Sequence, residues 1–209
     1  FEFLKSITAT AELTWGLLLS LYRKIPSSFE HVKKNQWNRD LFWGNELKNK
    51  VIGIVGFKNT GKTFFISQII KKLRSKNYRV ASIKHAHHDF QIDHQNTDSY
   101  IHRISGSSQV IVSSSKRWVK INELEDSDEK TLNELISEIS ETDIVLVEGY
   151  KNENHPKIEV IKDGTSRHLF QSINNIRAII SDTKVNTDLK QFKKNEIDDI
   201  VDYILNKIK

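Results

Sequence analysis

The sequence contains no cysteine, no methionine and no long apolar run. The lack of cysteine excludes disulfide bonds and thiolate metal sites, and it is compatible with a cytoplasmic location. No stretch reaches the roughly 18 to 20 apolar residues that span a bilayer, so no membrane partner is expected. The apolar run from Trp15 to Leu21 also lacks the cleavage site of a signal peptide. Because methionine is missing even at position 1, we expect a processed piece or part of a longer reading frame.

The chain of 209 residues also lacks any block of like charges. Its 32 basic residues exceed its 27 acidic ones, which gives a net charge of +5 and a pI of about 9.2. This balance favours anionic partners such as nucleotides. A nucleic-acid-binding tail usually clusters its basic residues, so we interpret the lysines as a solvated surface and expect no nucleic acid partner.

What is present falls into two unlike parts that meet near residue 50. Apolar residues recur at helical spacing in the first part: Leu13, Leu17, Leu21 and Ile25. This spacing predicts one helix ending at Pro26, and a second short helix is expected over 27–34. Residues 35–50 form a polar arm with aromatic side chains. One apolar helix hardly makes a core, so residues 1–50 are predicted to be a helical leader and not an independent domain.

From Val51 onward, apolar strands alternate with amphipathic helices. Residues 51–55 form a short apolar strand of the kind that is buried on both faces of a parallel sheet. A helix over 63–75 follows, with an inward set of Phe64, Ile66, Ile69, Ile70 and Leu73. Further strands are expected at 78–83, 109–113, 118–121, 143–147, 157–161 and 176–180, with helices at 99–104, 131–140 and 196–208. The alternation predicts an α/β domain over 51–209, with a mostly parallel sheet and helices on both faces.

A glycine-rich loop, GFKNTGKT at 56–63, joins the first of these strands to its helix. Gly56 and Gly61 permit backbone angles and close approaches that a Cβ would obstruct. The N–H groups of the loop and of the helix start then converge on phosphate oxygens. Lys62 is expected to reach the β- and γ-phosphates, and the Thr63 hydroxyl to bind Mg²⁺. The pattern predicts a P-loop NTPase-type fold whose nucleotide site also includes Lys58, Asn59, Thr60 and Phe64.

The buried strand over 144–147 ends at Glu148, which is followed by Gly149. P-loop sites use an acidic residue at such a strand end to hold the metal and its water shell. An ordinary strand-end glutamate would look the same. The unbroken apolar run before Glu148 and the glycine after it favour the metal-binding interpretation.

A histidine-rich segment, KHAHHDF at 84–90, follows the second strand. Because ligands of open α/β sheets lie beyond the carboxyl ends of the strands, this loop is expected near the phosphates. In the preferred interpretation, Asp89 serves the Mg²⁺ while Lys84 and the histidines contact anions. A solvated loop is the second interpretation. The third is a zinc site, built from His85, His87, His88 and His94.

Taken together, residues 51–209 resemble the MobB family of molybdopterin-guanine dinucleotide biosynthesis adaptor proteins. The resemblance rests on an ordered series: GFKNTGKT at 56–63, YRVASIKHAHHDF at 78–90, Asp93, DSY at 98–100, Arg117-Trp118, IVLVEGY at 144–150 and HPKIEV at 155–160. It implies a homodimeric protein with GTP and Mg²⁺ as cofactors and weak GTPase activity. It further implies work beside a MobA-like guanylyltransferase in making the guanine dinucleotide form of molybdopterin, the molybdenum cofactor.

The resemblance also suggests roles for particular residues. Lys62, Glu148 and Asp89 become the catalytic candidates, and Thr63, Asp89 and Glu148 the metal ligands. His87, His88 and Arg117 would meet anionic groups of the cofactor. The N-K-x-D signature of many GTPases is missing, so guanine specificity rests on the resemblance alone. Asp182, just past the expected strand 176–180, is a possible base-reading carboxylate, and an ordinary turn residue is an equally good interpretation.

The first fifty residues resemble a different family, the D-2-hydroxyacid dehydrogenases of the phosphoglycerate dehydrogenase type. The resemblance rests on ATAELTWGLLLSLYRKIP at 9–26, NQWNRDLFWGNELKNK at 35–50 and VIGIVG at 51–56. That family continues with Gly-x-Gly-x-x-Gly, whereas Lys58 stands at the middle glycine and would obstruct the approach to a pyrophosphate. No catalytic Arg, Glu and His set follows Lys62. We interpret the chain as a junction of two genes and expect its leader to be poorly anchored.

Three functional hypotheses follow. The leading one is a GTP-binding adaptor with weak GTPase activity. An NAD-dependent D-2-hydroxyacid dehydrogenase fragment is the rival suggested by the leader, and Lys58 disfavours it. The third is an interaction protein whose P-loop binds nucleotide without turnover. The sequence does not identify a residue that positions the attacking water, so the first and third hypotheses stay open.

Overall fold

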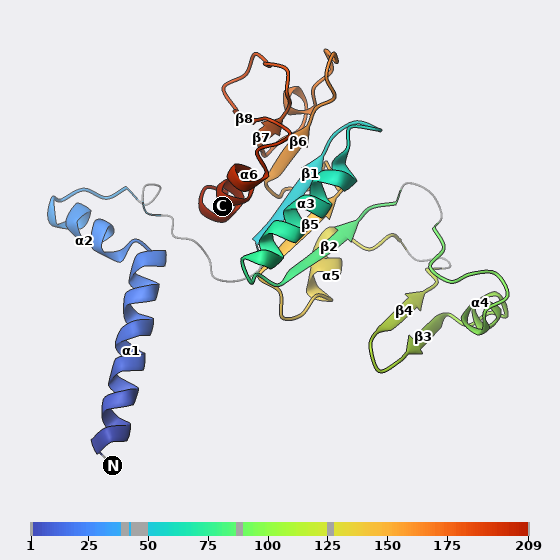
Figure 1. Cartoon of the computed structure of the whole chain (residues 1–209), viewed down its shortest axis with the longest axis horizontal. Coiled ribbons are helices and arrows are strands. Elements are labelled where there is room, and N and C mark those ends of the chain that lie inside the picture. Colours follow the sequence, from blue (N-terminus) through green and yellow to red (C-terminus); the bar gives the residue numbers. More distant parts are fainter. Residues whose placement is uncertain (1, 39–41, 43–49, 87–89, 125–127, 209) are drawn as a thin grey trace. The chain divides into compact units, whose positions relative to one another are not determined.

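The computed structural model describes residues 2–38, 42, 50–86, 90–124 and 128–208 (Figure 1). Two compact units divide the chain, residues 1–83 with 141–209 and residues 84–140. The first unit holds α1 (Glu2–Tyr22), α2 (Ile25–Lys33), β1 (Lys50–Val55), α3 (Lys62–Ser75), β2 (Val80–Lys84), β5 (Ile144–Glu148), β6 (Lys157–Val160), the 3₁₀ helix η2 (Leu169–Gln171), β7 (Ile176–Ile180), β8 (Lys190–Phe192) and α6 (Ile197–Asn206). The second unit holds α4 (Asp98–Ile104), β3 (Gln109–Ser113), β4 (Trp118–Asn122) and α5 (Leu132–Ser137). The predicted domain boundary at residue 50 stays a prediction.

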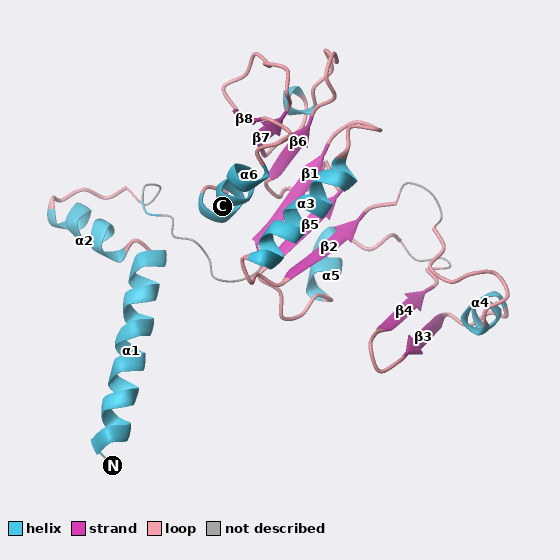
Figure 2. Ribbon diagram, viewed as in Figure 1, coloured by secondary structure: helices cyan, strands magenta, loops and turns pink. Residues whose placement is uncertain are grey.

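The first unit is built on a six-stranded sheet in the order β2-β5-β1-β6-β7-β8 (Figure 2). The pairs β1–β5, β1–β6, β6–β7 and β7–β8 are all parallel. Ile54 of β1 lies opposite Glu148 of β5 on one side and Ile158 of β6 on the other. The carboxyl ends of these strands therefore meet at one edge, and the mostly parallel α/β sheet predicted from the sequence is confirmed.

One face of this sheet packs against α3 and α6. The buried residues there come from both helices and from the central strands, and include Phe65, Ile69, Leu73, Ile200, Ile204, Ile52 and Leu146. Burying one such side chain contributes roughly 1.5–3 kcal/mol, so this cluster dominates the stability of the unit. Phe65 is 3% exposed, whereas Phe64 is 59% exposed. The prediction that Phe64 turns inward was wrong, because the helix starts at Lys62 in a phase that turns Phe65 toward the sheet.

The other face of the sheet carries a smaller buried cluster of Val55, Ile161, Leu169, Ile176 and Ile179. Leu169 belongs to η2, which was not predicted, and Phe170 and Ile173 pack around it. The cluster includes Val55, the last residue of β1 and the neighbour of Gly56 in the chain. In this cluster, residues that follow β6 pack with Val55 of β1, the strand that leads into the loop.

The N-terminal residues form two helices, as predicted, but Pro26 has a different role. The helix α1 ends at Tyr22, Lys24 takes a left-handed conformation with φ 53°, and Pro26 stands in the first turn of α2. Proline suits that position because its missing N–H would be unpaired there anyway. Several apolar side chains of α1 are exposed: Leu13, Trp15, Leu17, Leu19 and Leu21. Among the described residues, none of the helices combines the length and hydropathy that crossing a bilayer requires.

The second unit combines an antiparallel β3–β4 hairpin with α4. Val110 is paired with Ile121 and is buried. Asp93 is buried and accepts two hydrogen bonds from Arg103 of α4, at 2.9 and 3.0 Å, and these bonds lower the pKa of its carboxyl. This bidentate pair ties the segment before α4 to the helix.

Candidate nucleotide-binding site

The glycine-rich loop connects β1 to α3 at the carboxyl edge of the sheet. A Cβ on Gly56 would lie 2.6 Å from the carbonyl oxygen of Val160 and 2.7 Å from the hydroxyl of Thr60, so no larger residue fits without displacement. Gly61 has φ 89° and caps the start of α3. Asn59, which also lies in the loop, has a left-handed backbone conformation with φ 62°. The loop therefore curls tightly and presents the N-terminus of a 14-residue helix, as an anion-binding loop requires.

Two side chains of the loop converge on the backbone carbonyl of Phe57. The ammonium of Lys62 donates a hydrogen bond of 2.8 Å to this oxygen, and the hydroxyl of Thr60 donates one of 3.1 Å. Lys62 is thus folded back along the loop toward its second residue. Lys58 is exposed, so its side chain causes no crowding in the loop.

Thr63 and Glu148 lie together, although 85 positions separate them. The Thr63 hydroxyl is 3.3 Å from each carboxylate oxygen of Glu148. Thr63 is the second residue of α3, and Glu148 ends β5, the strand next to β1. A hydroxyl and a carboxylate supply the oxygen ligands that Mg²⁺ prefers, and Mg²⁺ usually keeps several waters as well. The donor set therefore fits a magnesium ion.

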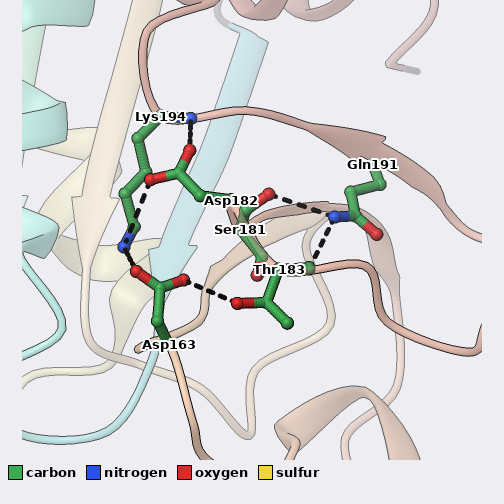
Figure 3. Close-up of polar contacts among 6 residues, drawn as sticks. All are labelled: Asp163, Ser181, Asp182, Thr183, Gln191 and Lys194. Carbon is green, nitrogen blue, oxygen red and sulfur yellow. Dashed lines mark hydrogen bonds and ion pairs between the residues drawn. The ribbon is translucent and has the colours of Figure 1, made fainter.

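Asp182 lies in a polar cluster at the ends of three neighbouring strands (Figure 3). Its Oδ1 accepts a 2.9 Å hydrogen bond from the backbone N–H of Lys194, and its Oδ2 is 3.7 Å from the Lys194 ammonium. The same ammonium pairs with Asp163 and lowers the pKa of that carboxyl. Asp163 follows β6, Asp182 follows β7 and Lys194 follows β8. Asp182 is half exposed, so its remaining lone pairs face solvent.

The side chain of Gln191 fixes the turn after Asp182 (Figure 3). Its amide donates to the carbonyl oxygens of Ser181 and Thr183, at 3.0 and 2.9 Å, and its Oε1 accepts from the N–H of Val185. Gln191 therefore holds the backbone on both sides of Asp182. Gln191 belongs to β8, a strand that was not predicted from the sequence.

The histidine-rich segment is only partly described. Asp89, His87 and His88 lie outside the described residues, so their proposed roles stay predictions. His85 belongs to the second unit and lies 2.9 Å from the Glu129 carboxylate. Within the described ranges, no group of three or more histidines and carboxylates is placed to hold a metal ion.

Two residues near the loop were not singled out from the sequence, Glu159 and Arg167. Glu159 is buried in β6, opposite Val55, and accepts hydrogen bonds from the N–H groups of Leu169 and Phe170. Burial raises the pKa of its carboxyl, and the two bonds oppose that shift. Arg167 lies over the ring of Phe57. The only signal available was a glutamate inside an otherwise apolar strand, in the segment HPKIEV.

Comparison with known proteins places this site in a family. The family model of molybdopterin guanine dinucleotide synthesis protein B, MobB, matches residues 51–182. The chain is 31% identical over 159 residues to the molybdopterin-guanine dinucleotide biosynthesis adapter protein of Escherichia coli (strain K12), covering 74% of this chain and 91% of that protein. The protein of the same name from Haemophilus influenzae is 32% identical over 168 residues, covering 79% of this chain and 92% of that one.

A solved structure of the same family resembles this chain over most of its length, whereas the similarity to a dehydrogenase covers only a short part of it. A crystal structure of molybdopterin-guanine biosynthesis protein B has a TM-score of 0.61 at 26% identity, over 74% of this chain and 97% of that chain. D-3-phosphoglycerate dehydrogenase from Sus scrofa is 43% identical over only 54 residues, which are 26% of this chain and 10% of that protein. Such a short match does not favour the dehydrogenase hypothesis. Since the family model and the relatives both span most of the chain, this chain belongs to the MobB family.

Proposed function

We propose that this chain is a GTP-binding adaptor with weak GTPase activity that assists synthesis of the guanine dinucleotide form of molybdopterin. The observation that carries the proposal is the contact between Thr63 and Glu148 beside a tightly curled glycine-rich loop. The names of the relatives from Escherichia coli and Haemophilus influenzae supply the pathway.

In this proposal each residue of the loop has a separate task. The Lys62 ammonium leaves the Phe57 carbonyl and meets the β- and γ-phosphates, while backbone N–H groups of the loop surround them. Thr63 and Glu148 would hold Mg²⁺ and its waters, and Asp89 is the further ligand proposed from the sequence. The bound Mg²⁺ would neutralise charge on the phosphates.

Asp182 is proposed to read the base. The P-loop follows β1, and Asp182 follows β7, two strands further along the sheet. A nucleotide lying along the carboxyl edge would place its base over this part of the sheet, which is the usual ligand position in open α/β folds. The ring N–H and the amino group of guanine can both donate hydrogen bonds to a carboxylate. The equivalent ring nitrogen of adenine is an acceptor, so it cannot donate one. The contact with Lys194 holds the Asp182 carboxylate in place for this purpose.

The partners in this proposal are a MobA-like guanylyltransferase, molybdopterin or its guanine dinucleotide, and a second copy of the chain. They rest on the family and on the word adapter in the names of the relatives. His87, His88 and Arg117 are the candidate contacts for the anionic groups of molybdopterin.

The direct test is a calorimetric titration of the full chain with GTP, ATP and NAD, each with and without Mg²⁺, together with an assay of phosphate release. We expect GTP to bind best, Mg²⁺ to strengthen binding, and phosphate release to be slow. Preferential binding of NAD would contradict the proposal. Binding of GTP without any phosphate release would identify instead an adaptor that does not turn over.

Two variants sharpen this test. Lys62→Ala is expected to weaken GTP binding strongly, because it removes a charged donor to the phosphates. Asp182→Ala is expected to reduce the preference for GTP over ATP while leaving ATP binding nearly unchanged. If Asp182→Ala keeps the wild-type preference, the carboxylate is a turn residue and not the base reader.

A further inference from the structure

Arg167 occupies an unexpected position at the glycine-rich loop. Its guanidinium lies over the ring of Phe57, with 5.3 Å between the central carbon and the ring centroid. Phe57 is the second residue of the loop, and its carbonyl oxygen is the acceptor for the Lys62 ammonium. Two cationic groups from distant parts of the chain therefore meet at one loop residue.

Glu159 fixes the segment that carries Arg167. Its buried carboxylate accepts the N–H of Leu169 at 2.7 Å and the N–H of Phe170 at 2.9 Å. Glu159 is paired in register with Val55, the residue before Gly56. Glu159 therefore holds the backbone two residues after Arg167, at Leu169, and it lies on the strand beside β1. Leu169 is buried as well, so this end of the segment is held by packing and by charge-assisted bonds.

The contact with Phe57 leaves the donors of Arg167 available. A cation–π contact engages the positive charge of the guanidinium and uses none of its N–H groups as hydrogen-bond donors. Arg167 is exposed, and among the residues that the structure describes no carboxylate forms an ion pair with it. An exposed cation–π contact is weak, so it orients the guanidinium without competing strongly with an anionic ligand.

We propose that Arg167 contacts the terminal phosphate of the bound nucleoside triphosphate and that Glu159 is its positioning residue. The inference rests on the proposed function, because it needs a triphosphate in the loop. Lys62 is the side chain that reaches the β- and γ-phosphates, and it lies at Phe57. The Arg167 guanidinium contacts the ring of the same residue, and in this proposal it therefore lies toward the γ-phosphate end of the site rather than the base.

The test compares GTP with GDP, which lacks the terminal phosphate. Arg167→Ala is expected to weaken GTP binding about 10-fold or more, the usual effect of losing a hydrogen bond to a charged group. GDP binding should change by less than about 2-fold, because Arg167 does not reach the β-phosphate in this proposal. Arg167→Lys keeps the charge without the planar fork and should show a smaller loss. Arg177→Ala, which removes an exposed arginine on β7, is the matched control and should leave both affinities unchanged.

Glu159→Gln tests the positioning role. It keeps the shape of the side chain but removes the charge that both N–H groups contact, so the segment with Arg167 should lose its fixed position. A positioning role predicts a fall in the GTP-to-GDP affinity ratio with GDP binding retained, whereas a purely structural role lowers the melting temperature and leaves the ratio unchanged. Circular dichroism checks that each variant is folded.

The outcomes separate the two proposals. If the wild-type chain binds neither GTP nor GDP, the proposed function fails and this inference fails with it. If the wild type prefers GTP and Arg167→Ala keeps that preference, Arg167 does not contact the terminal phosphate, while the proposed function stands. If both Arg167→Ala and Glu159→Gln lose the preference and Arg177→Ala keeps it, the inference is supported.

Discussion

The Thr63 hydroxyl lies 3.3 Å from both carboxylate oxygens of Glu148, and the pair joins the start of α3 to the end of β5. Neither residue belongs to the buried core, so this contact contributes little to stability. Its value is geometric, because it places a neutral and an anionic oxygen ligand side by side at the helix N-terminus. In the proposed function, these two residues supply part of a magnesium site.

Glu148→Gln should therefore uncouple nucleotide binding from Mg²⁺. The substitution keeps the size of the side chain and removes its charge, and loss of one partner around a bound metal typically lowers metal affinity about 10- to 100-fold. We expect GTP affinity in Mg²⁺ to fall toward the value measured in EDTA, with the fold retained. Calorimetric titration with and without Mg²⁺ measures this effect. Glu153→Gln, an exposed glutamate in the turn after β5, should retain the wild-type response.

Gly56→Ala tests the close approach of the loop to β6. The new Cβ would lie 2.6 Å from the Val160 carbonyl oxygen, which is backbone and has little freedom to move. We expect a loss of about 1–3 kcal/mol in the free energy of unfolding, as for other overpacked sites, and weaker GTP binding. Urea unfolding and a GTP titration measure the two effects. Gly106→Ala is the control: φ is 99° there but no atom lies within 4 Å of the added Cβ, so GTP binding should be unaffected.

Lys157 is a buried cation without a carboxylate partner in its hydrogen bonds. It is 1% exposed, and its ammonium donates to the carbonyl oxygens of Glu153, His155 and Asn174 at 2.6–3.1 Å. Lys157→Met would remove these three bonds, of which only the one to His155 is fully buried. Because a buried unpaired acceptor costs about 1–3 kcal/mol, we expect a loss of that size in the free energy of unfolding. Lys151→Met, at an exposed position, should stay within about 0.5 kcal/mol of wild type in the same urea titration.

The α/β fold was predictable because apolar strands alternate with amphipathic helices from Val51 onward. The failures have local causes. The strand β8 is only three residues long and begins with Lys190 and Gln191, so it shows no hydrophobic period. Pro26 was interpreted as the end of one helix, although proline fits the first turn of the next equally well. Adjacent Phe64 and Phe65 could not be separated by periodicity, because a shift of one residue in the helix start exchanges their faces.

The site divides in the same way. The loop at 56–63 was visible because its working residues are consecutive, and Glu148 was visible because it ends an apolar run. The contacts of Arg167 with Phe57, and of Glu159 with Leu169, join residues whose separation in sequence carries no pattern. Lys194 was likewise invisible as a partner of Asp182, because their contact depends on β8 lying beside β7. Local chemistry could be predicted, whereas long-range pairing required the fold.

His155 should make the stability of the chain depend on pH. It is 7% exposed, and within the described residues neither ring nitrogen has a hydrogen-bond partner. Burial, with a further contribution from the charge of Lys157, lowers its pKa from 6.5 to about 4. Well above pH 6.5 the imidazole is neutral in both states and contributes no pH dependence. As the pH falls from 6.5 to 4, the unfolded chain binds a proton that the folded chain does not, so the free energy of unfolding falls by up to about 3 kcal/mol.

His155→Leu isolates this contribution. Leucine does not titrate, and since the ring nitrogens have no partners in the described structure, the substitution breaks no hydrogen bond. We expect the variant to lose less stability than wild type when urea unfolding is repeated at pH 7.5, 6, 5 and 4.5. His102→Gln removes an exposed histidine and should retain the wild-type slope. An equal fall in stability for His155→Leu and wild type would show that other groups cause the acid sensitivity, because a titrating His155 is the only difference between the two chains.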